Sequence, residues 1–288
     1  MTLEDAADVS WVDADGIRTR FKVLGQGPPI LLFSPGGFDA SLEAWHSHDH
    51  YRRLGLLESL QERYSCIIFD KREAGASGGR LQRITWHDYA RQAVALLDHL
   101  GVGQAHLLGA CIGCSVAVTF GLAYPERVDR IVLWSPAGGP RYRMMQELRF
   151  ASHLAYTVDH SLADVVDLAR SGANFSADGR VGPWASALRA DRAFAELFAA
   201  TDLLRYRTLV RGTLRALFDR DTVPGPEPED LMTLDRRVLI VPGNDASHAP
   251  SAAAYLSECL PSSETWDTLP DEQTETNARA RVFDFLAG

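Results

Sequence analysis

The sequence predicts an α/β fold, with one mostly parallel sheet of about eight strands and helices on both of its faces. Short, continuous apolar runs recur along the first half of the chain and return near its end, as is typical of strands buried on both faces. The clearest of these runs are 30–33, 66–69, 105–108, 128–134 and 238–241. Segments with apolar residues at helical spacing separate most of them, and this alternation implies parallel strands joined by helices. The chain has 288 residues, of which 46% are hydrophobic, so it can bury a substantial core.

Composition narrows the classes of function. The net charge is −9 and no basic cluster stands out, so nucleic acid is not an expected partner. No apolar run approaches the roughly 20 residues of a membrane span, and the acidic segment 1–10 lacks the apolar centre of a signal peptide. The four cysteines are too few and too scattered for a disulfide framework. We therefore expect a cytoplasmic protein with reduced thiols that acts on a small-molecule substrate and not on membranes, and a homodimer is compatible with the sequence.

The first third of the chain supplies a hairpin and a glycine-rich loop. The strands predicted at 9–13 and 17–24 flank the turn Asp-Ala-Asp-Gly and form an antiparallel hairpin. The buried strand 30–33 then runs into the loop Ser-Pro-Gly-Gly-Phe, which contains Gly37 and Phe38.

A second loop follows the next buried strand, 66–69. It reads Asp-Lys-Arg-Glu-Ala-Gly-Ala-Ser-Gly over 70–78, and we expect its Glu73 to lie at the surface. Apolar residues at helical spacing then predict a helix over 86–100, with Gly101 as its C-cap.

The most informative stretch surrounds Cys111. A predicted strand, 105–108, meets Gly-Ala-Cys-Ile-Gly, and a helical pattern follows at once over 115–124. A nucleophile on a strained turn between a strand and a helix needs small neighbours, and Gly109 and Gly113 provide them. The N-terminus of the helix would also direct free N–H groups and a positive dipole end at whatever Cys111 attacks.

This arrangement resembles the nucleophile elbow of the α/β-hydrolase superfamily, with cysteine at the nucleophile position. The loops 34–38 and 70–78 are also similar to loops of that superfamily. The resemblance implies an α/β-hydrolase fold that carries a helical lid. It further implies an oxyanion hole made by the backbone N–H groups of Ile112 and of Gly37 or Phe38.

The alternation of strands and helices breaks between 137 and 235. This segment is helical in pattern, with glycine and proline breakers, and it is inserted between two core strands. It therefore resembles the helical lid of α/β-hydrolases, which would select the substrate and exclude water. The expected organisation is an N-terminal part of the core over 1–136, the lid over 137–235 and a C-terminal part of the core over 236–288.

The sequence departs from the superfamily at two catalytic positions. The triad acid of the superfamily lies in a Gly-x-x-Asp-x-x-x-Pro loop, and aligning this loop on Gly243 and Pro250 puts Ala246 at the acid position. Asp245 stands one residue earlier. The catalytic histidine of the superfamily follows the last strand, but in this chain no histidine follows His248.

Three hypotheses therefore compete. In the first, Cys111 attacks a small ester, lactone or thioester, with His248 as base and Asp245 as its orienting acid. A thiol suits such an improvised base, because a helix N-terminus or a protonated histidine can lower the pKa of a free cysteine from about 8.5 into the physiological range. Dienelactone hydrolases are a branch of the superfamily that uses cysteine, although they retain the usual histidine and aspartate.

The second hypothesis is a non-hydrolytic lyase, cyclase or acyl-transfer enzyme, with Glu272 or Asp271 as an alternative acid or base near the position of the missing histidine. In the third, chemistry has been lost, Cys111 is an inert buried side chain, and the pocket only binds a small ligand.

Two further motifs invite a metal or redox interpretation. His46, His48 and His50 alternate along the chain, but no distant ligand completes a zinc site, and a solvated surface segment explains them better. Cys111 and Cys114 form Cys-x-x-Cys, yet Cys114 in the first turn of a helix is better explained as packed against the sheet. No glycine-rich phosphate loop follows a strand, so we expect neither an organic cofactor nor a metal.

Overall fold

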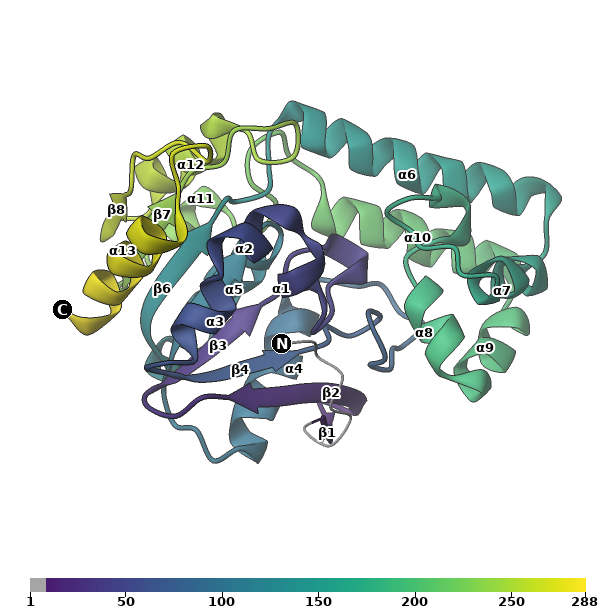
Figure 1. Cartoon of the computed structure of the whole chain (residues 1–288). Coiled ribbons are helices and arrows are strands. Elements are labelled where there is room, and N and C mark those ends of the chain that lie inside the picture. The colour runs from purple at the N-terminus through teal and green to yellow at the C-terminus, as the bar shows by residue number, and fades with distance from the viewer. Residues whose placement is uncertain (1–8) are drawn as a thin grey trace.

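The computed structural model describes residues 9–288, which form one eight-stranded sheet with helices around it (Figure 1). The order of strands across the sheet is β1-β2-β4-β3-β5-β6-β7-β8. The strands are β1 (Ser10–Ala14), β2 (Ile17–Leu24), β3 (Pro29–Phe33), β4 (Ser65–Phe69), β5 (Ala105–Ala110), β6 (Val128–Trp134), β7 (Arg237–Val241) and β8 (Ser263–Thr265). β1 pairs antiparallel with β2 and β2 with β4, whereas every other pair is parallel. The predicted α/β-hydrolase type of fold, with its mostly parallel sheet, is confirmed.

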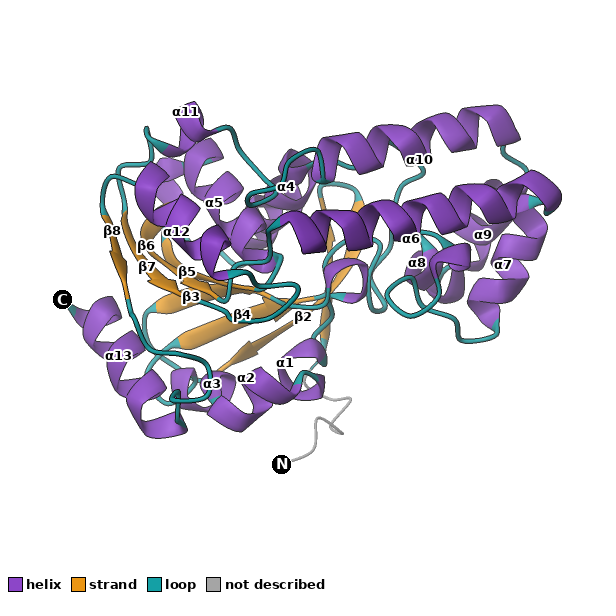
Figure 2. Cartoon of the chain, turned by 90° about the horizontal axis from the view of Figure 1, so that it is seen from above, coloured by secondary structure: helices purple, strands orange, loops and turns teal. Residues whose placement is uncertain are grey.

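Helices cover both faces of the sheet (Figure 2). One face carries α1 (Ala44–Ser47), α2 (Asp49–Leu54), α3 (Leu56–Leu60) and α13 (Glu275–Ala287). The other carries α4 (Trp86–His99), α5 (Gly113–Ala123), α11 (Pro228–Leu231) and α12 (Pro250–Cys259). This arrangement explains the continuous apolar runs of the sequence, because successive side chains of a strand point to opposite faces and both faces are covered.

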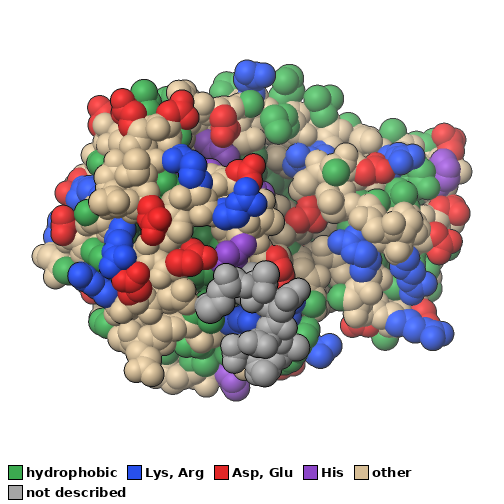
Figure 3. Space-filling view, viewed as in Figure 1, with side chains coloured by type: hydrophobic (Ala, Val, Ile, Leu, Met, Phe, Trp, Pro, Cys, Tyr) green, Lys and Arg blue, Asp and Glu red, His purple; other side chains and the backbone are tan. Residues whose placement is uncertain are grey.

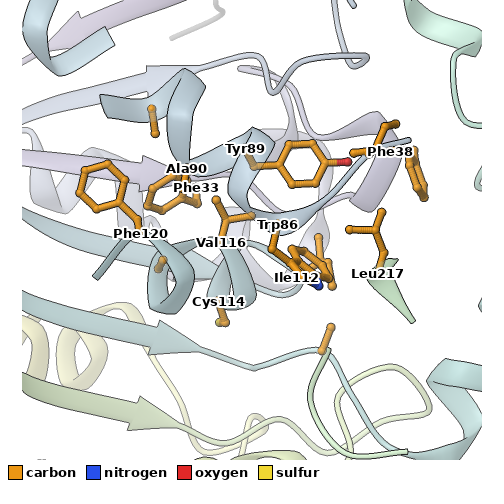
Figure 4. Close-up of a cluster of buried hydrophobic side chains, with 14 of the residues drawn as sticks. Phe33, Phe38, Trp86, Tyr89, Ala90, Ile112, Cys114, Val116, Phe120 and Leu217 are labelled. Atoms are coloured by element: carbon orange, nitrogen blue, oxygen red, sulfur yellow. The ribbon is translucent and has the colours of Figure 1, made fainter. Parts of the chain in front are cut away.

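The alternation of side chains divides the interior into two cores. Leu31, Leu107 and Ile131 point toward α4 and α5, while Leu32, Leu108 and Val132 point into the core that α13 closes. All six side chains are excluded from solvent. The close-up in Figure 4 shows part of the first core, where Trp86 and Tyr89 of α4 lie near residues that follow β3 and β5.

The segment between β6 and β7 is helical, as its pattern predicts, and it extends to one side of the sheet (Figure 1). Its elements are α6 (Pro140–Asp159), α7 (Leu162–Arg170), η4 (Gly179–Val181), α8 (Ala185–Ala190), α9 (Arg192–Ala199) and α10 (Leu203–Leu217), followed by α11, which packs back on the sheet side against α5 and α12. Two short 3-10 helices lie elsewhere in the fold, η2 (Gly37–Asp39) after β3 and η3 (Pro125–Arg127) before β6. Capping boxes at Thr85 and Ser161 fix the starts of α4 and α7, because each side chain accepts from, and each backbone N–H donates to, the third helical residue.

The surface carries mixed charge. On the face drawn in Figure 3, acidic and basic side chains are interspersed, and no broad basic area gathers there. Among the helices built by residues 9–288, none combines the length and the apolar character that crossing a membrane requires.

Candidate active site

Cys111 lies on the sharp turn between β5 and α5. Its φ angle is 56°, a left-handed conformation that a non-glycine residue rarely adopts. The turn also brings backbone groups very close together, since a Cβ on Gly113 would lie 2.2 Å from the carbonyl oxygen of Phe33, and one on Gly109 would lie 2.6 Å from that of Gly113. Both glycines are therefore required by the packing of the turn, which has the geometry that the sequence predicts around Cys111.

Hydrogen bonds from β6 and the segment after it hold this turn in place. The Cys111 N–H donates to the carbonyl oxygen of Trp134 at 3.0 Å, and the Cys111 carbonyl accepts from the N–H of Ala137 at 3.2 Å. Cys114 is fully buried and its Sγ lies 3.1 Å from the carbonyl oxygen of Gly109, so it packs against the sheet as predicted. Cys111 is the partly accessible member of the pair.

The loops after the neighbouring parallel strands β3 and β5 both carry backbone N–H groups without an acceptor in the described part of the chain. Positive φ angles at Gly36 (106°) and Gly37 (64°) turn the chain after β3 into η2. The N–H groups of Gly37, Phe38 and Ile112 donate to no acceptor within residues 9–288. Free N–H groups beside a nucleophile are what an oxyanion hole needs.

His248 comes from the loop after β7, and a compact turn holds it. The Asp245 carboxylate accepts from the N–H groups of Ser247 and His248, at 2.7 and 3.0 Å. Gly138, after β6, donates its N–H to the carbonyl oxygen of Ser247 at 2.9 Å. A Cβ on Gly243 would lie 2.4 Å from the Cβ of His248, so this glycine lets the loop close tightly.

The structure brings Cys111, His248 and Asp245 together. Nδ1 of His248 lies 2.8 Å from an Asp245 carboxylate oxygen. The other ring nitrogen, Nε2, is buried and has no hydrogen-bond partner in the described part of the chain, which leaves it free for the sulfur or for a substrate. Burial by itself lowers the pKa of His248, but the nearby Cys111 sulfur and the Asp245 carboxylate outweigh it and raise the pKa to about 9.

The Asp245 carboxylate responds in the opposite sense. Partial burial would raise its pKa, but the hydrogen bond and the positive charge of His248 lower the pKa below its usual value. The Asp245 side chain is nevertheless 63% exposed, so water screens much of its interaction with the imidazole.

A cavity of about 360 Å³ opens beside Cys111 and His248. Gly37 and Tyr51 line it from the core, and Gln146 and Arg149 of α6 line it from the helical segment. The Tyr51 hydroxyl is buried without a hydrogen-bond partner among residues 9–288, and burial, with a further contribution from Cys111, holds its pKa well above the usual value. Sequence analysis missed Tyr51 and Arg149, because neither belongs to a motif.

The alternating histidines have three separate environments. His46 Nε2 lies 2.7 Å from Glu58, His48 faces the cavity, and His50 Nε2 accepts from the indole N–H of Trp134 at 3.2 Å. Burial lowers the pKa of His50 to about 4, and this imidazole is therefore neutral at pH 7. Across residues 9–288 no three His, Cys, Asp or Glu side chains gather in a way that could hold a metal ion.

Two acidic residues of the sequence analysis lie outside the cavity. Glu272 is exposed in the turn before α13, where its carboxylate only approaches the N–H of Leu269. The expectation that Glu73 lies at the surface is wrong. Its side chain is 1% exposed and pairs with the buried Arg72 at 3.0 Å, because this loop folds inward beneath the helical segment.

Comparison with known proteins identifies the family. A family model described as "alpha/beta hydrolase fold" matches residues 29–181. The chain belongs to the α/β-hydrolase fold family. The same fold recurs in the crystal structure of a hydrolase from Pseudomonas aeruginosa PA01, with a TM-score of 0.64 and 20% sequence identity over 99% of this chain and 100% of that one.

Curated relatives within this family include a hydrolase and a transferase. The chain is 28% identical, over 260 residues, to the dihydrolipoyllysine-residue acetyltransferase component of the acetoin cleaving system of Cupriavidus necator, covering 87% of this chain and 61% of the relative. It is 26% identical, over 137 residues, to 2-hydroxy-6-oxo-6-phenylhexa-2,4-dienoate hydrolase of Comamonas testosteroni, covering 46% of this chain and 44% of the relative. The chain thus spans less than two thirds of the length of either relative.

Proposed function

We propose that the protein is a hydrolase that uses Cys111 as its nucleophile on a small ester, lactone or thioester. The observation that carries this proposal is that Cys111 and His248 line one cavity, with His248 paired to Asp245 and with backbone N–H groups in the adjacent loops that have no acceptor among residues 9–288. A strained nucleophile, a paired imidazole and an oxyanion hole together are the requirements of acyl transfer through a covalent intermediate. The hydrolase among the relatives supports the reaction class.

Acylation begins with His248 holding the proton of Cys111. With a pKa of about 9, the imidazole is protonated at pH 7. In this proposal that proton comes from Cys111, which attacks as the thiolate. The sulfur attacks the substrate carbonyl carbon, a carbon–sulfur bond forms, and the π electrons move onto oxygen, where the backbone N–H groups stabilise the charge. The tetrahedral intermediate collapses, the bond to the leaving alcohol or thiol breaks, and His248 donates its proton to that group.

Deacylation restores the starting state. The now neutral His248 takes a proton from water, and the hydroxide oxygen attacks the thioester carbonyl carbon. The second tetrahedral intermediate collapses by breaking the carbon–sulfur bond. It releases a carboxylic acid and leaves Cys111 as a thiolate beside protonated His248.

The helical segment 137–235 serves as a lid in this proposal. Its Ser176 donates through both N–H and hydroxyl to the Asp39 carboxylate of η2, which ties the segment to the loop that carries Gly37 and Phe38. The part of the cavity wall that it contributes combines the polar Gln146, Arg149 and Asn174 with Tyr142 and Met145. A small substrate with both an apolar part and a polar group therefore fits this cavity.

A second candidate function is acyl transfer to an alcohol or thiol in place of water. The acetyltransferase component that matches along 87% of this chain favours it, and the acyl–Cys111 intermediate would be the same. The two candidates differ only in the acceptor. The ratio of acid to transferred product, measured with an added alcohol or thiol, separates them.

The direct test is release of p-nitrophenol from short p-nitrophenyl esters by wild type, Cys111→Ala and Cys259→Ala. Cys259 is a partly accessible cysteine on α12 and serves as the matched control. We expect Cys111→Ala to lose about 10³-fold or more of the rate, with Cys259→Ala unchanged, and an acyl adduct on Cys111 to be detectable by mass spectrometry. Equal rates for wild type and Cys111→Ala would overturn the proposal, and ligand-induced thermal stabilisation without product would then indicate a binding protein.

A further inference from the structure

A half-buried lysine lies beside the loop that carries two of the free N–H groups. Lys71 directly follows Asp70 at the end of β4, and its Nζ donates to the carbonyl oxygen of Gly37. Its own backbone N–H donates to the carbonyl oxygen of Ala40 at 3.2 Å. Lys71 is thus tied to both ends of η2.

We propose that Lys71 is a positioning residue, which aims and polarises the Phe38 N–H as a donor to the oxyanion. The carbonyl of Gly37 and the N–H of Phe38 belong to one peptide unit. In a trans peptide these two groups lie in one plane and point in opposite directions, and no cis peptide bond occurs in residues 9–288. A hydrogen bond that fixes the carbonyl therefore also fixes the direction of the N–H.

The location of Lys71 determines the direction of the Phe38 N–H. Gly37 lines the cavity that contains Cys111, whereas Lys71 does not line it. Lys71 instead lines a small neighbouring pocket, together with Phe33 and Ile112. Its hydrogen bond turns the Gly37 carbonyl toward the side of the loop that Lys71 occupies, so the Phe38 N–H of the same peptide unit points to the opposite side, where the proposal places the substrate oxygen.

The environment of Lys71 is unusual for a cation. Its ammonium lies 4.4 Å from the ring centre of Tyr89 and 5.4 Å from that of Phe38, and Figure 4 shows the Tyr89 hydroxyl directed toward Phe38. It forms no ion pair with a carboxylate in the described part of the chain. Aromatic faces stabilise a buried cation, but they replace only part of the hydration that it loses.

The chain otherwise uses arginine for positive charge. Lys22 and Lys71 are its only lysines among 29 basic residues. Burial lowers the pKa of Lys71 to about 8, against the opposing effects of Glu73, Asp39 and Cys111, so the ammonium is still charged at pH 7. A compact ammonium fits behind the loop and concentrates its charge on one carbonyl, unlike a planar guanidinium.

The chemical consequence concerns the transition state more than the ground state. A cation bound to a carbonyl polarises the whole peptide unit and makes its N–H a stronger donor. Negative charge on the substrate oxygen develops only after attack, so the benefit appears in the rate and not in substrate binding. Losing one oxyanion-hole donor costs about 10²–10³-fold in rate, which sets the upper range for a residue that aims and strengthens one. This inference rests on the proposed acyl-transfer function.

Two reactions of the same cysteine separate a role at the oxyanion from a structural role. Acylation of Cys111 by p-nitrophenyl acetate passes through an oxyanion, whereas alkylation by iodoacetamide is a displacement at a saturated carbon and does not. Both rates are measured in wild type, Lys71→Met and Lys22→Met. Lys22, a buried lysine on β2, is the control for loss of the other lysine of the chain.

We expect Lys71→Met to lower the acylation rate by about 10²-fold, with the KM for the ester changed by less than about 3-fold. Alkylation of Cys111 should stay within about 5-fold of wild type, since only the charge near the sulfur changes. Lys22→Met should leave both rates near wild type. A variant that has lost the local fold would instead show the two reactions changing together.

The possible results separate the role of Lys71 from the proposed acyl-transfer function. An unchanged acylation rate in Lys71→Met, or equal losses in acylation and alkylation, would overturn the role of Lys71 while leaving the proposed function intact. Absence of any Cys111-dependent acylation in wild type would overturn both, because no oxyanion would then be formed at this site.

Discussion

The two sides of the candidate site are built in different ways. On one side, the loops after β3 and β5 present a strained cysteine and backbone N–H groups. The geometry of these loops depends on glycines, because a Cβ would collide with neighbouring backbone or the φ angle is positive. On the other side, the loop after β7 supplies the proposed base and acid, His248 and Asp245, as side chains only three residues apart. The fold itself fixes the position of main-chain groups. A side chain that acts as base needs only to reach the nucleophile, so a loop other than the superfamily's usual one can supply it.

The largest effect is expected on the side-chain side, from His248→Ala. Because this variant removes both the partner of the thiolate and the proton donor, we expect acylation to fall by about 10³-fold at neutral pH. Measured rates with p-nitrophenyl acetate, with and without added imidazole, check this. A loss below about 3-fold would mean that another group acts as the base.

The pH dependence of the acylation rate in wild type tests the same role of His248. The pKa of His248 is raised to about 9, so its protonated form is present below that pH and is lost as the pH rises through it. The acylation rate should therefore decline as the pH rises through about 9. A rate that continues to rise there would contradict a protonated His248 as the donor to the leaving group.

On the main-chain side, Gly113→Ala should cost stability. The added Cβ would lie 2.2 Å from the Phe33 carbonyl oxygen, so β3 or the turn must shift. We expect the free energy of unfolding to fall by about 3 kcal/mol, as for an overpacked core. Gly103→Ala is the control, because nothing lies within 4 Å of its Cβ position. Urea denaturation measures both variants, and equal stabilities would show that the elbow tolerates a side chain.

A smaller effect is expected from Asp245→Asn. The carboxylate raises the pKa of His248, so its loss should move the upper edge of the pH profile below 9. Since the Asp245 side chain is 63% exposed and screened by water, we expect the rate at neutral pH to fall by only about 10-fold. The pH profile of kcat/KM tests this, and an unshifted edge would show that Asp245 does not act through His248.

The smallest effect is expected from Glu272→Gln. Glu272 is exposed and does not line the cavity, so the rate should change by less than about 2-fold. A loss of about 10-fold or more would favour the alternative in which this carboxylate acts as acid or base in place of His248.

The sequence predicts the main-chain side better than the side-chain side, and the reason is physical. Continuous apolar runs and the Gly-x-Cys-x-Gly pattern are local signals, so the sheet and the turn at Cys111 follow from them. The position of His248 at the cavity beside Cys111 depends on how the loop after β7 folds back against Gly138, which no local pattern records. The catalytic roles of His248 and Asp245 remain predictions, although the structure places them together.

Contacts between segments that are far apart along the chain leave no local signal in the sequence. Glu73 looks like a surface residue in a polar loop, but the packing of this loop against the helical segment buries it beside Arg72. Lys71 sits in the same polar loop, and its importance emerges only when the fold sets it behind Gly37. Tyr51 reaches the cavity from α2, on the opposite face of the sheet from α5. Such residues are found from geometry and not from motifs.

The measurement that tests the central claim most directly is the pH dependence of Cys111 alkylation by iodoacetamide, located by mass spectrometry, in wild type and His248→Ala. If Cys111 and His248 form an ion pair, wild type should alkylate at a nearly constant rate between about pH 6 and pH 8. In His248→Ala the rate should fall about 10-fold or more toward the acidic end of that range, as for an unassisted thiol. An unreactive Cys111 in wild type, or identical profiles for the two proteins, would contradict the pairing of Cys111 with His248.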